Sequence, residues 1–130
     1  MNYLIILIAL HSFLLCQSVQ ILVDKNAIEK GESITLSIES KGSEKFPDVD
    51  MSILDRDFEI LSGPSQQTNI QWINGKMEST KTLTWNILPI KMGNVFIPSI
   101  NGKIDDKKFT SKPILIKIRN KSSSKSDNIF

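Results

Sequence analysis

The chain has 130 residues, and its 16 Lys and Arg against 14 Asp and Glu give a formal net charge of +2. Its single histidine, His11, and its single cysteine, Cys16, both lie in an apolar N-terminal stretch that we expect to be removed. The rest of the chain then cannot form a Cys/His zinc site, a disulfide, a thiolate nucleophile or a histidine-assisted triad. The composition therefore favours a binding module over an enzyme and predicts no cofactor.

The N-terminal stretch has the pattern of a secretory signal. Its apolar run over 3–15 is interrupted at His11 and Ser12 and is shorter than the roughly 20 residues that a membrane-spanning helix needs. Small side chains before a cut after Ser18 predict a cleaved signal peptide over 1–18 and export to the periplasm or extracellular side of a bacterial envelope. An uncleaved anchor and lipidation at Cys16 are the alternatives. No comparable apolar stretch follows, so we expect no transmembrane helix in the mature chain.

Residues 19–119 are expected to form one all-β domain, because apolar and polar residues alternate with a period of two. Each stretch then buries one face and exposes the other. No segment has a sustained helical period. In chain order, the expected strands cover 19–23, 33–39, 58–60, 82–87, 94–97 and 114–118.

Asn74-Gly75 is the strongest turn signal, since both residues tolerate the positive φ angles of a type I′ hairpin. A two-residue loop there would place Trp72 opposite Met77, with Ile70 on the same face. Other expected turns are Lys30-Gly31, Gly63-Pro64, Asn101-Gly102 and Asp105-Asp106.

About seven to eight short strands in this length predict an immunoglobulin-like antiparallel β-sandwich. Trp72 and Trp85 are its expected heaviest core residues. Residues 120–130 are expected to be a disordered polar tail. The basic C-terminal third has only Phe109 among its lysines, which is typical of solvated strand faces, so we expect no nucleic-acid partner.

The middle of the chain resembles a known family. Its pieces are DFEILSGP at 57–64, INGK at 73–76, LTWNILP at 83–89, KMGNVFIP at 91–98 and the closing segment 102–118. In this order and spacing they resemble the N-terminal domain of BatD, the oxygen tolerance protein of bacterial aerotolerance operons.

The resemblance implies an exported β protein encoded beside von Willebrand factor A domain membrane proteins, which become the expected partners. It supplies no catalytic residues. Family members are usually several times longer, with further β domains and a membrane helix. Since this chain resembles only the first domain, a truncated, non-functional fragment is one alternative reading.

Carboxylates are densest at Asp48, Asp50, Asp55 and Asp57. Their spacing lacks the Gly and terminal Glu of a calcium loop, so a solvated loop is the favoured reading, and no metal site is predicted. The leading functional hypothesis is a non-catalytic interaction module in a BatD-like envelope assembly for oxygen or stress tolerance. The candidate interaction loop residues are Asp55, Asp57, Glu59, Gly63, Pro64, Asn74 and Gly75.

Von Willebrand factor A domains commonly hold a metal ion, and a carboxylate from a partner can complete the coordination of that ion. Asp55, Asp57 or Glu59 would be the donor. The alternative from another class is a stand-alone carbohydrate or cell-surface-binding sandwich, which requires Trp72 or Trp85 to face solvent. An exposed strand edge that accepts a partner strand is a further route to binding.

Overall fold

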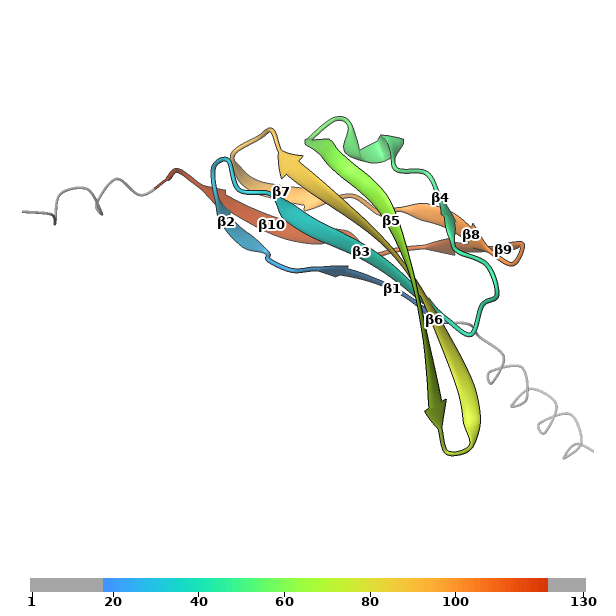
Figure 1. Ribbon diagram of the computed structural model, residues 1–130. Coiled ribbons are helices and arrows are strands. Elements are labelled where there is room, and N and C mark those ends of the chain that lie inside the picture. Colours follow the sequence, from blue (N-terminus) through green and yellow to red (C-terminus); the bar gives the residue numbers. More distant parts are fainter. Residues whose placement is uncertain (1–17, 122–130) are drawn as a thin grey trace, which may run out of the picture.

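The computed structural model describes residues 18–121, in which ten β-strands and one 3₁₀ turn form an all-β fold (Figure 1). The predicted fold class is confirmed, but the expected seven to eight strands were too few. The additional strands are short: β2 (Ala27–Glu29), β4 (Asp48–Val49), β8 (Asn101–Ile104) and β9 (Lys107–Thr110). Two to four residues contain too little alternation for a period of two to be recognised.

The largest sheet has four antiparallel strands in the order β1-β3-β6-β5. The two inner strands carry the strongest alternation in the chain, and their pairing places Leu36 opposite Trp85 and Ile38 opposite Leu83. The strands are β1 (Ser18–Val23), β3 (Ile34–Lys41), β5 (Phe58–Ile73) and β6 (Lys76–Pro89).

Two three-stranded sheets form the opposite layer of the sandwich, behind the four-stranded sheet in Figure 1. One has the order β2-β10-β7, with β7 (Gly93–Ile97) and β10 (Ile114–Arg119); the other has the order β4-β8-β9. The β2–β10 pair is parallel, which departs from the antiparallel expectation. The chain between β4 and β5 contains the 3₁₀ turn η2 (Ser52–Leu54).

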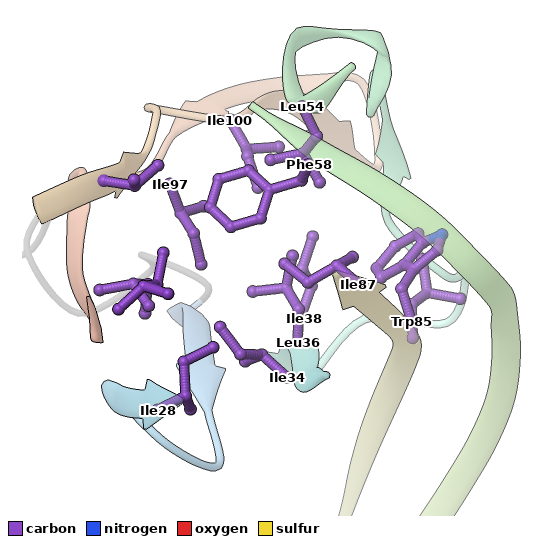
Figure 2. Packing of buried hydrophobic residues seen from close by; sticks show 14 residues of the cluster. Ile28, Ile34, Leu36, Ile38, Leu54, Phe58, Trp85, Ile87, Ile97 and Ile100 are labelled. Carbon is purple, nitrogen blue, oxygen red and sulfur yellow. The ribbon is translucent and has the colours of Figure 1, made fainter. Parts of the chain in front are cut away.

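The core lies between the layers and consists of the apolar faces that the alternation predicts (Figure 2). Phe58, at the start of β5, is 1% exposed and lies among residues of both layers. Burial of such side chains is the main favourable term in folding, at about 25 cal/mol per Å² of apolar surface. The buried cluster comprises Ile28, Ile34, Leu36, Ile38, Leu54, Phe58, Leu83, Trp85, Ile87, Val95, Ile97, Ile100, Ile116 and Ile118.

The tips of β5 and β6 extend past this core as a two-stranded ribbon, which projects from the body in Figure 1. Trp72 lies on the ribbon and is 71% exposed, so its predicted place in the core was wrong. Trp85, on the body part of β6, is 4% exposed and confirms the other half of the prediction. Both tryptophans lie in short stretches that alternate between apolar and polar residues, but no second layer covers the ribbon.

The turns at Lys30-Gly31 and Asp105-Asp106 are confirmed, whereas Asn101-Gly102 and Gly63-Pro64 lie within β8 and β5. The stretch around Gly63-Pro64 is therefore a strand and not the expected loop. Both glycines are explained by close contact instead. A Cβ on Gly102 would lie 2.6 Å from the Phe109 ring, and one on Gly63 would lie 2.7 Å from the Thr84 carbonyl oxygen.

The expected signal peptide, apart from Ser18 in β1, lies outside the described residues, as do Cys16 and positions 122–130 of the expected tail. Within 18–121, no helix has both the length and the apolar character needed to cross a membrane.

Replacing Phe58 tests the core. We expect Phe58→Ala to lower the free energy of unfolding by about 3–5 kcal/mol, because it removes a fully buried ring and leaves a cavity. Urea denaturation followed by circular dichroism measures the change. Phe96→Ala is the matched control, since Phe96 is 54% exposed. Equal losses in the two variants would contradict the described core.

Candidate interaction surface

The ribbon ends in the hairpin turn that the sequence predicts. Asn74 has φ 52° and Gly75 has φ 77°, the positive values of a type I′ turn. The register sets Trp72 opposite Met77 and Ile70 opposite Ser79. Since paired residues share a face, the predicted grouping of Trp72, Met77 and Ile70 on one face is confirmed.

Large apolar side chains gather at the end of the ribbon. Of the ten exposed large hydrophobic residues among the described positions, four fall between 70 and 77. We call Ile70, Trp72, Ile73 and Met77 the apolar tip. Ile73 lies on the face opposite the other three, because side chains alternate along a strand. Single exposed apolar residues are ordinary on a protein surface, whereas a contiguous group is typical of an interaction site.

The base of the ribbon is held at Gly63. Its φ is 115°, and a Cβ there would come within 2.9 Å of the Trp85 side chain. The β5–β6 register shifts on both sides of Ser62, so a bulge separates the body part of β5 from the ribbon part. Asn86 Nδ2 donates a hydrogen bond to Ser62 Oγ at 3.0 Å across this bulge.

Lys81 supports the ribbon from β6. Its Nζ donates a hydrogen bond to Thr68 Oγ1 at 3.2 Å and lies 5.3 Å from the centre of the Phe46 ring. The hydrogen bond is exposed and therefore modest, whereas the Phe46 ring is partly buried against the core. Together with the bulge they tie the first part of the ribbon to the body, while the apolar tip extends beyond them.

The candidate acids lie at the other end of β5. Asp57 is 23% exposed at its side chain and forms an ion pair with Lys91, with Oδ1 and Nζ 2.5 Å apart. Its carbonyl oxygen also accepts a hydrogen bond from the Ile90 amide at 3.0 Å. Asp57 thus joins the η2 segment to the β6–β7 connection. Asp55 and Glu59 are both exposed.

An open groove of about 610 Å³ runs along β4, β8 and β9, where Asp48 and Asp50 face the same space as Lys103 and Lys108. Hydrogen bonds from the Ser52 hydroxyl and the Ser52 amide lower the pKa of Asp50 below its usual value. No three His, Cys, Asp or Glu side chains within 18–121 are grouped to hold a metal ion.

The structure therefore distributes the sequence-predicted site residues instead of gathering them. Asp55, Asp57 and Glu59 lie at the start of β5, Gly63-Pro64 at its bulge, and Asn74-Gly75 at the ribbon turn. From Glu59 to Asn74 an extended strand spans on the order of 50 Å. The acids and the turn consequently belong to separate surfaces.

The exposed apolar tip was not predicted from the sequence, since Trp72 was expected in the core. A signal was present in the residues just before it. Positions 65–69 read SQQTN and place no apolar side chain on either face of the strand. A strand that packs on a core carries an apolar residue at about every second position. Five residues without one therefore indicate that the opposite layer of the sandwich ends before Ile70.

A family model described as the BatD DUF11 like domain matches residues 22–118, from β1 to β10. The chain belongs to the BatD family. A comparison with curated proteins found no match. BatD proteins are associated with the bacterial envelope and are not a known family of enzymes. The resemblance seen in the sequence is therefore confirmed.

The two tryptophans of this BatD domain should be distinguishable by fluorescence. Because Trp72 is exposed and Trp85 is buried, we expect Trp72→Phe to remove the red-shifted emission that acrylamide quenches and to leave a blue-shifted, shielded component. Quenching titrations on the wild type and the variant measure this difference. If the Trp72→Phe variant kept as much acrylamide-quenchable emission as the wild type, the exposure of Trp72 on the ribbon would be contradicted.

Gly63→Ala tests the base of the ribbon. We expect it to cost about 2 kcal/mol of folding free energy, because the added Cβ meets the Thr84 carbonyl oxygen and the φ of 115° disfavours an L side chain. Thermal unfolding measures the loss. Gly75→Asn is the control, since nothing lies within 4 Å of a Cβ at Gly75 and asparagine tolerates its φ of 77°. A stable Gly63→Ala variant would rule out the close approach to Trp85.

Proposed function

We propose that this chain is an exported, non-catalytic protein-interaction module of a BatD-like envelope assembly associated with oxygen or stress tolerance. The apolar tip is the observation that carries the proposal. Ile70, Trp72 and Met77 are each more than half exposed, on a ribbon that extends beyond the body. Covering such side chains is favourable in water, and tryptophan is prominent among residues that dominate binding energy.

The proposed partners are von Willebrand factor A domain membrane proteins, as the family context suggests. The acidic end of β5 supplies a second contact in this proposal. Asp55 and Glu59 are exposed, and in this proposal one of their carboxylates completes the coordination of a metal ion held by the partner. Asp57 is the weaker donor of the three, because it would first have to leave its ion pair with Lys91.

A pull-down tests the proposal, with the full chain as bait on detergent-solubilised envelope and mass spectrometry as readout. We expect enrichment of a von Willebrand factor A domain protein. The double variant Trp72→Ser/Met77→Ser should reduce the enrichment at least about tenfold, since it removes the centre of the apolar tip. Phe96→Ser is the matched control, because Phe96 is an exposed apolar residue on the body.

Two further pull-down experiments test the acid-donor role separately from the role of the apolar tip. Asp55→Asn/Glu59→Gln should weaken binding, and EDTA should release the partner, if a carboxylate completes the partner's metal. Full binding by this variant would reject the acid-donor role. A folded bait that enriches no protein through the apolar tip would reject the interaction module itself.

Carbohydrate binding is the second candidate, and the exposure of Trp72 is the specific observation that favours it. An exposed indole can stack on a sugar face, and Met77 extends the same apolar face. A glycan array read with wild type and Trp72→Ala separates the candidates. Binding lost in the variant supports the sugar site, while a blank array removes it.

A further inference from the structure

The outer edge of β5 is unpaired along its whole ribbon part. β5 is the last strand of its sheet, and β6 occupies its other side from Ser65 to Ile73. Among residues 18–121, no backbone hydrogen bond joins this outer edge to another strand. An unpaired ladder of this kind is a template for a further strand.

The hairpin turn determines which groups face outward. In a two-residue type I′ hairpin the residues that flank the loop, Ile73 and Lys76, form a hydrogen-bonded pair. Bonding therefore alternates down the ribbon, and every second residue of β5 directs its N–H and C=O away from β6. The residues that present both groups to the outer edge are Gln66, Thr68, Ile70 and Trp72.

Beyond the bulge at Ser62 and Pro64, this edge lacks the charges that usually protect an edge strand against pairing. Residues 60–73 contain no Asp, Glu, Lys or Arg, although edge strands commonly carry charges that block association. Other edges of the domain are either charged, as β9 is with Lys107 and Lys108, or short, as β1 and β7 are with six and five residues. A two-stranded ribbon is also only marginally stable by itself in water.

We propose that β5 pairs antiparallel with β5 of a second copy of this chain about a twofold axis at Asn69. In a twofold interface a charge at or next to the axis would lie near its own counterpart, so the uncharged residues Thr68, Asn69 and Ile70 suit pairing with a second copy. The register centred on Asn69 is the one that uses all of 65–73. It ends at the bulge, where Pro64 has no N–H to offer.

In this register the outward groups meet one another. Gln66 pairs with the partner's Trp72, and Thr68 pairs with the partner's Ile70, each pair exchanging two hydrogen bonds. The result is a four-stranded sheet, β6-β5-β5-β6, with the two bodies at opposite ends because the strands are antiparallel. The pairing does not depend on the proposed function, since it uses the backbone edge and leaves Met77 on β6 free for another partner.

Charge placed on the axis tests the pairing. Wild-type full chain should be a concentration-dependent dimer in analytical ultracentrifugation. Asn69→Lys puts two ammonium groups across the axis and should raise the dimer dissociation constant at least about tenfold; Asn69→Asp should do the same with two carboxylates. Mixing the two variants should restore a dimer, because opposite charges then face each other. Phe96→Lys adds the same charge at β7 and should leave the dimer intact.

A disulfide tests the register. Asn69 would form a non-hydrogen-bonded pair with the partner's Asn69, with Cα atoms about 4.5 Å apart, which is within disulfide range. Asn69→Cys in a Cys16→Ser background should therefore yield a covalent dimer on mild oxidation, and Phe96→Cys in the same background should not. A wild-type chain that is monomeric at every concentration, or a dimer unaffected by Asn69→Lys, would overturn the proposal.

Discussion

The structure depends on the contact between Gly63 of β5 and Trp85 of β6. At this point β6 passes from a strand covered by a second layer to one half of an open ribbon. On the body side, Trp85 and Ile87 are buried against the opposite sheets. On the ribbon side, Leu83 is still buried, residues 79–82 are half-buried, and residues 76–78 at the end of the strand are exposed. Because Gly63 has no Cβ, β5 can come close enough to the indole to close the core there.

The body and the ribbon of the domain differ in what their side chains do. The body buries a continuous apolar cluster between its layers, and that burial stabilises the fold (Figure 2). Leu83 is the one residue of the ribbon in this buried cluster. The other side chains of the ribbon are therefore not needed for the core and are available for contacts with another molecule. Asp57 illustrates the converse case. Its ion pair with Lys91 and its bond to the Ile90 amide make it a structural residue at the acidic end.

The ribbon offers two distinct contact features. The apolar tip presents side chains, whereas the outer edge of β5 presents backbone groups. The two features can act together, because strand pairing uses groups in the plane of the sheet and side chains project from its faces. In the two proposals made above, this BatD domain would therefore pair with a copy of itself along one edge and bind a different protein at the tip.

Much of the fold was predictable from local patterns. Alternation identified β1, β3 and β10 and the body part of β6, and Asn74-Gly75 identified the hairpin with its register. These features depend on neighbours in sequence, which is why one chain suffices to recognise them. The hairpin β8–β9 was missed because two four-residue strands that together contain Gly102 and three lysines resemble loops.

The sequence by itself determined the all-β class, the Asn-Gly turn and the grouping of Ile70, Trp72 and Met77 on one face, since each follows from backbone geometry over a few residues. Which of the two tryptophan-bearing apolar faces is buried was decided only by the tertiary structure. Trp72 and Trp85 sit in similar alternating stretches, yet one is 71% exposed and the other 4%. The difference arises because the opposite sheets cover β6 at Trp85 and end before the ribbon, and coverage depends on how distant segments pack together.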